Sequence, residues 1–340
     1  MFIAGKCDYC GKCLTRCKYI DFEAAQEGEA FAKLVRGEPS EWLRKCITCF
    51  ACNECCPTGA RPFDLILERL EALGDYVDPN LFNAIKGRFA PKGEFQAPAV
   101  KKPVISLCTI EPNMSWAFQG KIFAGADFVR GRHFFCNVLF PHIGNESVLR
   151  EGLQPLVDKY AALGVDEIVF VHDDCYALFT DLAAQYDIKV PFKPVHLFEH
   201  LLRYLKAHPE EIRALNLKVA YQRPCASRYS PEKEPMLDEI FGLIGVTRVD
   251  RKYDRIEALC CGQALKGFMK RGEKYPEYQQ LNIQDAQEHG AGTMVFLCPM
   301  CLDALYKPCK DAGMETFMIS DLCRLAIGET LPAEAYQNLG

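Results

Sequence analysis

The chain has 340 residues, of which 49% are hydrophobic and 25% charged, and a formal net charge of -5. This size and composition allow a sizeable core and two or three domains, and the negative charge argues against a general nucleic-acid surface, which needs clustered Lys and Arg. No apolar run approaches the roughly 20 residues of a membrane helix, and the start MFIAGKCDYC lacks the pattern of a signal peptide. We therefore expect a soluble, cytoplasmic protein.

Nineteen cysteines are the most informative feature of the composition. Disulfide-rich scaffolds are usually small, loop-rich secreted domains, whereas this chain is large enough for a full core. In a reducing compartment, cysteines grouped as C-x-x-C indicate ligands of metal ions or iron–sulfur clusters. Because exposed thiolates are readily oxidised, so many of them also indicate an anaerobic or oxygen-shielded setting.

Residues 1–87 contain two cysteine quartets with the spacing C-x-x-C-x-x-C-x-x-x-C, which is that of a bacterial two-cluster ferredoxin. In that arrangement the fourth cysteine of each quartet ligates the other cluster. We therefore predict a small helical, ferredoxin-like domain over residues 1–87 with two cubane [4Fe–4S] clusters. The predicted ligands of the first cluster are Cys7, Cys10, Cys13 and Cys56. The predicted ligands of the second are Cys46, Cys49, Cys52 and Cys17.

Other features of this segment are consistent with that prediction. A zinc ribbon, the alternative, needs two cysteine pairs rather than two quartets. Cys55 is an extra thiol; the spacing and Pro57 favour its neighbour as the ligand, so we expect Cys55 to be buried packing. Residues 20–45 are predicted to be a polar helical insertion with a break at Gly37 and Pro39.

A linker and an internal repeat follow the ferredoxin-like segment. Apolar residues recur at helical spacing from Phe63 to Leu73, and Gly74 can end that helix. Residues 88–103 contain three prolines and little periodicity, so we expect a linker there. Beyond it, residues 104–212 and residues 213–340 repeat one pattern of apolar runs that end at cysteines, a helical segment, and a strand followed by a helix.

Short apolar runs that alternate with helical segments predict βα units and a mainly parallel sheet in each half. The runs end at Cys108, Cys136, Cys175, Cys225, Cys261 and Cys301. These positions correspond to the carboxyl edge of the strands, where open α/β sheets bind ligands. The predicted fold class is therefore α/β, with a small helical ferredoxin-like domain before two pseudo-repeated halves that bury a cluster between them or against a neighbouring domain.

The second half carries the pattern C-x34-CCG-x35-C-x-x-C. Its thiols are Cys225, Cys260, Cys261, Cys298 and Cys301. Two adjacent cysteines cannot easily both face one small tetrahedral ion, so a zinc site explains the pair poorly, whereas an iron–sulfur cluster explains it better. Buried apolar cysteines are the plain alternative. That alternative is our expectation for Cys309 and Cys323, which fall in helical segments.

The first half has an incomplete version of this pattern. It retains Cys108, Cys136 and Cys175, and His172 stands where the second half has the first cysteine of its C-x-x-C group. Three thiols and an imidazole are a donor set for zinc or for a conventional cluster. The alternative is that these residues are the remnants of a lost site, kept for packing.

The complete CCG pattern resembles the cysteine-rich CCG domain of heterodisulfide reductase, and the quartets resemble those of its two-domain catalytic subunit. Together the two resemblances cover nearly the whole chain. Similar layouts occur in the iron–sulfur subunits of glycolate oxidase and anaerobic glycerol-3-phosphate dehydrogenase, and in a membrane complex that serves dissimilatory sulfite reductase. The resemblance implies that the five CCG cysteines hold a noncubane [4Fe–4S] cluster. Because the first half is incomplete, it implies one such cluster rather than two.

The resemblance implies an iron–sulfur electron-transfer and catalytic subunit of an anaerobic oxidoreductase complex. A flavoprotein or another electron-transfer subunit would supply the cubane clusters, which pass electrons singly to the noncubane cluster. A disulfide would be cleaved there, with one sulfur captured by iron and the other leaving as a thiolate. The alternative is a non-catalytic conduit between a flavin dehydrogenase and a quinone or membrane cytochrome, which would bring the chain to the inner membrane face. A redox sensor is a third, less favoured class.

Basic residues accompany the CCG cysteines. Arg223 and Arg228 flank the first of them, and Lys266 and Lys270 follow the CCG itself. We expect such residues to attract an anionic substrate or to raise the potential of the cluster, and solvated side chains are the alternative for the two lysines. The sequence has no GxGxxG or P-loop pattern, so flavin or nicotinamide chemistry would come from another subunit.

Overall fold

The N-terminal part of the chain is helical in this computed structural model, which describes residues 1–22, 26–101, 103–110, 112–268, 275–333, 335–336 and 339. Lys270 lies outside the described residues. The helices of this part are α1 (Lys12–Thr15), α2 (Glu27–Val35), α3 (Ala51–Glu54), α4 (Pro62–Leu73) and α5 (Pro79–Phe89). The predicted helix that ends at Gly74 is confirmed as α4, because Gly74 takes the left-handed conformation (φ +69°) typical of helix ends.

Two four-stranded sheets, with every strand pair parallel, form the framework of the rest of the described chain. The first has the order β2-β1-β3-β4 and contains β1 (Val104–Cys108), β2 (Asp127–Arg130), β3 (Glu167–Phe170) and β4 (Lys193–His196). The second has the order β6-β5-β7-β8 and contains β5 (Leu217–Gln222), β6 (Val246–Arg248), β7 (Thr293–Phe296) and β8 (Glu315–Met318). The two orders are equivalent, which confirms the predicted α/β fold with two pseudo-repeated parallel halves.

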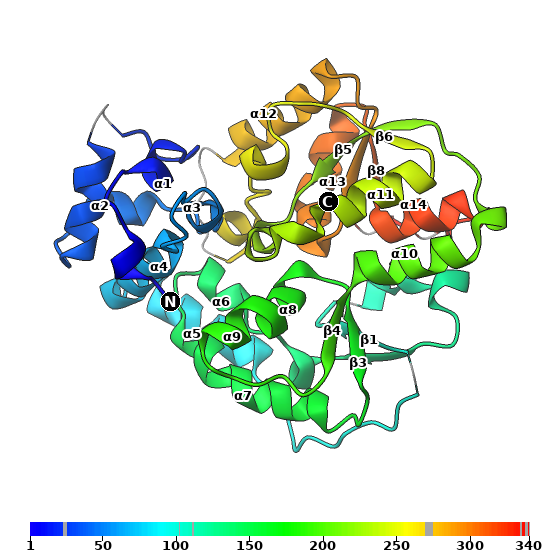
Figure 1. Ribbon diagram of the computed structural model, residues 1–340, viewed down its shortest axis with the longest axis horizontal. Coiled ribbons are helices and arrows are strands. Elements are labelled where there is room, and N and C mark those ends of the chain that lie inside the picture. The colour runs from blue at the N-terminus through cyan, green and yellow to red at the C-terminus, as the bar shows by residue number, and fades with distance from the viewer. Residues whose placement is uncertain are drawn as a thin grey trace.

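Helices connect and cover these strands. Those of the first half are α6 (Leu139–His142), α7 (Ser147–Ala161), α8 (Asp173–Ala177), α9 (Ala183–Gln185) and α10 (Leu197–Ala207). Those of the second half are α11 (Glu234–Leu243), α12 (Tyr275–Glu288), α13 (Pro299–Asp311) and α14 (Ile319–Ala326). Figure 1 shows the N-terminal helices beside both halves, and α10 packs against α11 where the halves meet. Among the described helices, none has the length and apolar character needed to cross a membrane.

The structure differs from the sequence prediction at the second cysteine group of each half. The runs at 132–136 and 257–261 are not strands, and the strands β2 and β6 lie upstream of them. The residue directly after each cysteine group, Asn137 (φ +60°) or Gly262 (φ +77°), is left-handed. An extended strand cannot continue through that conformation, so the cysteines lie in loops.

Both faces of β1 are covered, which explains its mainly apolar sequence VISLC. Along β1, Ile105 and Leu107 pack in the core that includes the second half, whereas Val104 and Cys108 pack in the core that includes the N-terminal helices. Successive side chains point to opposite faces of a strand, so the sheet lies between these two parts of the molecule. The cysteine at its end is therefore enclosed rather than exposed.

Candidate functional site

The two N-terminal quartets share one backbone conformation. Between the first two cysteines of each quartet, Tyr9 (φ +57°) and Thr48 (φ +54°) are left-handed. Directly after the second cysteine, Gly11 (φ +71°) and Phe50 (φ +64°) are left-handed as well. Residues other than glycine rarely adopt this conformation, which carries a cost in energy. Its recurrence at matching positions indicates a backbone shaped to present the thiols of both quartets in the same way.

The structure brings the predicted ligands of each cubane cluster together. One recess is lined by Cys7, Cys10, Cys13 and Cys56. A second recess is lined by Cys17, Cys49, Cys52 and the extra Cys55. Cys46 lies close enough to Cys49 and Cys17 for their charges to raise the pKa of its thiol, although burial is the larger cause. Cys10 is exposed, so the first quartet reaches the surface of the molecule.

The five thiols of the CCG pattern form a continuous chain of contacts. Cys225 begins η8, a 3-10 turn (Cys225–Tyr229) after β5, and Cys298 caps the N-terminus of α13, whose first turn holds Cys301. The Sγ atom of Cys225 lies 3.5 Å from that of Cys260. Further thiol hydrogen bonds join Cys260 to Cys261, Cys261 to Cys301, and Cys301 to Cys298. All five predicted residues therefore lie together.

These contacts favour the thiolate form at two positions. Hydrogen bonds from Cys225 and Cys261 lower the pKa of the Cys260 thiol well below its ordinary value. A hydrogen bond from Cys301 lowers the pKa of the Cys298 thiol in the same way. Metals bind thiolates rather than thiols, so the arrangement is prepared for metal ligation.

Gly262 shapes the loop that carries the adjacent cysteines. Its amide donates a hydrogen bond to Cys260 Sγ at 3.2 Å, and a Cβ atom added at Gly262 would collide with the ring of Tyr275. The first half keeps the same turn with Asn137 after Cys136, because asparagine tolerates the left-handed conformation better than most residues. Both halves therefore retain the backbone of a cysteine site.

The spacing of these thiols fits extended clusters better than single ions. In the described part of the chain, no three of the five CCG thiols, and no three of either quartet, lie within 4.8 Å of one another. A zinc ion holds sulfur ligands at about 2.3 Å and so needs them closer together. All of these cysteines are free thiols. The donor sets therefore fit iron–sulfur clusters, whose thiolate ligands are spread over several metal atoms.

A cavity of about 440 Å³ lies between the two halves. All five CCG cysteines line it, and the first half contributes Cys108, Cys136, His142, His172 and Asp174. The apolar side chains of Phe89, Ile110 and Met114 form another part of its wall. A cavity of this size is typical of a small-molecule site, and here sulfur atoms and proton-exchanging groups share its surface.

The first half contains a compact group of three thiols. The Sγ atoms of Cys108, Cys136 and Cys175 all lie within 4.8 Å of one another, and all three residues are buried. Hydrogen bonds from Cys136 and Cys175 lower the pKa of Cys108 well below its ordinary value. Cys108 is left-handed (φ +54°), a conformation that a non-glycine residue rarely adopts. The predicted fourth member, His172, instead places its Nε2 atom 2.9 Å from Cys298 Sγ of the second half.

A buried polar network holds the halves together beside His172. The Asp173 carboxylate lies 3.0 Å from His196 Nε2 and 2.9 Å from Lys233 Nζ, and it accepts a hydrogen bond from the Ser227 hydroxyl. Burial would raise the pKa of Asp173, but Lys233 and His196 outweigh it and lower that pKa. Since Asp173 begins α8 and Ser227 belongs to η8, the network fixes the thiols that these elements carry.

The second quartet lies next to the CCG thiols. Tyr19, two residues after Cys17, accepts a hydrogen bond from the backbone N–H of Cys260 at 2.7 Å. Burial raises the pKa of Tyr19 well above its ordinary value, and the charges of Cys49 and Cys260 add to this effect. The phenol therefore lies between the second N-terminal quartet and the CCG thiols.

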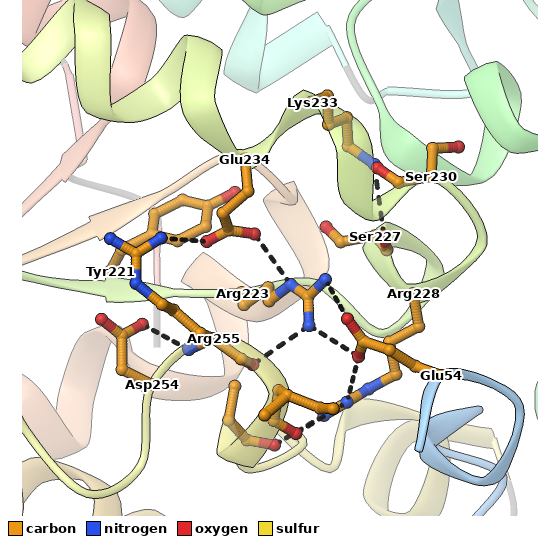
Figure 2. A network of polar contacts seen from close by, with 12 residues as sticks. Glu54, Tyr221, Arg223, Ser227, Arg228, Ser230, Lys233, Glu234, Asp254 and Arg255 are labelled. Atoms are coloured by element: carbon orange, nitrogen blue, oxygen red, sulfur yellow. Dashed lines mark hydrogen bonds and ion pairs between the residues drawn. The ribbon is translucent and has the colours of Figure 1, made fainter. Parts of the chain in front are cut away.

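Two buried arginines of the second half, Arg223 and Arg228, contact the N-terminal helices through Glu54 (Figure 2). Arg223 donates two hydrogen bonds of 2.8 Å to the Glu54 carboxylate, and Arg228 donates a third of 2.8 Å. Arg223 also lies 3.0 Å from Glu234. Both arginines thus face the N-terminal helices rather than the cavity. Lys266 is exposed to solvent, which agrees with the alternative of a solvated side chain.

Tyr19, Glu54, Asp173 and Lys233 are among the site residues that the sequence analysis did not single out. They carry no local signal because their partners are distant in the chain. Cys309 and Cys323 are fully buried in the hydrophobic core and are not among the residues that line the cavity, as expected for cysteines that pack in a core.

Comparison with known proteins agrees with this geometry. Residues 219–306 match the family model of the CCG cysteine-rich domain. A search among curated proteins finds no match to the chain. The matched segment contains all five thiols that line the cavity from the second half. The CCG match and the cysteine groups together indicate an iron–sulfur redox function.

Proposed function

We propose that the chain is an iron–sulfur subunit of an anaerobic oxidoreductase complex of the heterodisulfide reductase type. Its two ferredoxin quartets hold [4Fe–4S] cubane clusters, and the five CCG thiols hold a noncubane [4Fe–4S] cluster at which a disulfide is reduced. The observation that carries this proposal is the cavity whose wall includes all five CCG thiols. The cluster itself would take up the part of this cavity beside the CCG thiols, as it would in a pure electron conduit. The rest of the wall, which includes Phe89, Met114, His172 and Asp174, favours catalysis over the conduit alternative.

The arrangement of the quartets supports a path for electrons from the first quartet at the surface to the CCG thiols. The first quartet reaches the surface at Cys10, whereas Tyr19 ties the second quartet to Cys260. Electrons from a flavoprotein or another electron-transfer partner would enter at the first quartet. When bound, the CCG cluster would supply electrons and a thiophilic metal to the substrate sulfur.

The protein's own groups prepare the cavity for a disulfide. Apolar side chains such as Phe89 and Met114 exclude water, and the Asp173 network keeps the two halves at a fixed separation. His172 and Asp174 line the same cavity, so groups that exchange protons stand beside the sulfur atoms. A substrate held between the halves would therefore meet the CCG thiols on one half and these proton-exchanging groups on the other.

We also propose that the three thiols of the first half hold a metal, zinc or a further cluster. Their mutual distances, all within 4.8 Å, suit a single ion such as zinc. Since Cys108 and Cys136 line the cavity, a metal held by this group would lie at the cavity wall.

Iron and sulfide analysis of anaerobically purified protein tests the central assignment. Three four-iron clusters predict about twelve iron atoms per chain. Cys261→Ser is expected to reduce this number to about eight, whereas Cys309→Ser, which removes a buried thiol outside every site, is expected to leave it unchanged. A wild-type count near eight, with no loss in Cys261→Ser, would show that the CCG thiols hold no cluster.

A further inference from the structure

Arg228 is bound to the two segments that present the CCG thiols nearest the ferredoxin part. It belongs to η8, three residues after Cys225. Its guanidinium donates hydrogen bonds to the carbonyl oxygens of Ile256 at 3.1 Å and Ala258 at 2.8 Å. Ala258 precedes Cys260 by two residues. Arg228 therefore connects the loop of Cys225 to the loop of Cys260, and the thiols of these two residues contact each other.

The same guanidinium faces the second ferredoxin quartet. Arg228 lines the recess that also contains Cys17, Cys49 and Cys52, and it donates a 2.8 Å hydrogen bond to Glu54. Its side chain is only 5% exposed. Burial disfavours its charge, yet Cys49 and Glu54 outweigh burial and raise the pKa of Arg228. A permanent positive charge is therefore buried between the two groups of thiols.

We propose that Arg228 is a positioning residue that sets the reduction potentials of the second ferredoxin cluster and the CCG cluster together. This inference rests on the proposed function, because it concerns the clusters assigned there. Reduction adds one negative charge to a cluster, and a nearby buried cation stabilises that charge because the protein interior screens it weakly. Cluster potentials depend on local charge and on hydrogen bonds near the sulfurs. Arg228 raises the reduction potentials of both clusters, so the two potentials change together.

Glu54 supplies the opposite charge in the same place. Its carboxylate is shared between Arg228 and Arg223, so neutralising it leaves two buried cations near the second quartet. Removal of the Glu54 charge should therefore raise the potentials that removal of the Arg228 charge lowers. Opposite signs from two contacting residues distinguish an electrostatic role from a general loss of structure, which would shift both variants in the same direction.

Arg248 is a matched control within the same network. It is 6% exposed and lies 2.7 Å from Glu234, which in turn pairs with Arg223. In the part of the chain that the structure describes, its other ion pairs are with Asp238 and Asp254. Its loss should disturb the network as much as the loss of Arg228, without removing a charge beside the thiols.

The test is an EPR-monitored redox titration of full-length, cluster-loaded protein. Arg228→Gln should lower the potentials of the CCG cluster and of one ferredoxin cluster by at least a tenfold change in the reduction equilibrium, about 59 mV for one electron. Glu54→Gln should raise both. Arg228→Lys, which keeps the charge, should restore them to within threefold of wild type, and Arg248→Gln should leave them unchanged.

Each result bears on the inference separately from the proposed function. Equal shifts in Arg228→Gln and Arg248→Gln, or unchanged potentials in both Arg228→Gln and Glu54→Gln, would overturn the role of Arg228 while the clusters remain established. If Arg228→Gln fails to retain clusters, the upward shift expected in Glu54→Gln decides the question. A wild-type protein without a CCG cluster would contradict the proposed function instead, and the second ferredoxin cluster alone would still test the charge of Arg228.

Discussion

The Nε2 atom of His172 lies 2.9 Å from the Sγ atom of Cys298, a contact that crosses from the first half of the molecule to the second. The other ring nitrogen lies 3.4 Å from the Asp174 carboxylate. Burial acts to lower the pKa of His172, but Asp174 and Cys298 outweigh it and raise that pKa well above its ordinary value. The imidazole is thus placed to donate a hydrogen bond to a CCG sulfur.

Replacement of His172 should change the potential of the CCG cluster and leave the potentials of the two N-terminal clusters unchanged. His172→Phe keeps a ring but removes the donor, and loss of a hydrogen bond to a ligand sulfur is expected to lower the potential of that cluster. The shift should be at least threefold in the reduction equilibrium and is measured by redox titration. His133→Phe, which alters a histidine bound to the Lys92 carbonyl, is the control. An equal shift in both variants would contradict a specific role for His172.

Gly262 should be needed for the CCG site to form. Gly262→Ala introduces a Cβ in a left-handed conformation, which costs about 1–2 kcal/mol, and also forces that atom into the ring of Tyr275. We expect the variant to lose the CCG iron, about four atoms per chain. Gly290→Ala, at φ +82° with open space around it, shares the strain but not the collision. Full iron content in Gly262→Ala would show that the loop adapts.

Lys233 should stabilise the contact between the halves. Lys233→Met leaves the fully buried Asp173 without its cation, and such a loss costs about 3–5 kcal/mol in the free energy of unfolding. Lys206→Met removes an ion pair with Glu239 in which both side chains are about half exposed, so we expect a loss of under about 1 kcal/mol. Urea denaturation of both variants measures the difference. Similar losses would mean that the buried network contributes little.

The three thiols of the first half should bind metal independently of the CCG site. Cys136→Ser removes one of three donors, so metal analysis should show the loss of first-half metal with the CCG iron retained. Cys323→Ser, which alters an equally buried thiol outside the group, is the control. Unchanged metal content in Cys136→Ser, with both proteins folded, would favour a purely structural role for the three cysteines.

Sequence spacing predicted the groups of thiols because each group is local or repeats a regular pattern. The quartets and the CCG pattern place cysteines at fixed intervals, and the alternation of apolar runs with helical segments predicted the parallel sheets. The same reasoning misplaced two strands, since the runs that end at Cys136 and Cys261 have strand-like composition but precede left-handed residues. Amino-acid composition alone does not show that a residue such as Asn137 adopts the left-handed conformation.

The sequence analysis did not predict the contacts between distant segments. His172 aligns with a cysteine of the other half, so the sequence suggested it as a fourth ligand beside the three thiols of the first half. In the structure the two halves face each other, and His172 contacts Cys298 instead. Arg228 lies three residues after Cys225 in the sequence, but its burial against Glu54 depends on how the N-terminal helices pack. Such pairings follow from tertiary packing, which local patterns do not encode.

The most direct test of the account is EPR of the anaerobically purified protein before and after oxidation in the presence of a thiol. We predict a new paramagnetic signal that requires the thiol and is absent in Cys260→Ser and Cys261→Ser, because the sulfur would bind at the cluster on the cavity wall. Cys309→Ser should retain the signal. Ferredoxin-type signals on reduction, with nothing added by oxidation with thiol, would contradict disulfide chemistry at the CCG site and leave the protein an electron conduit.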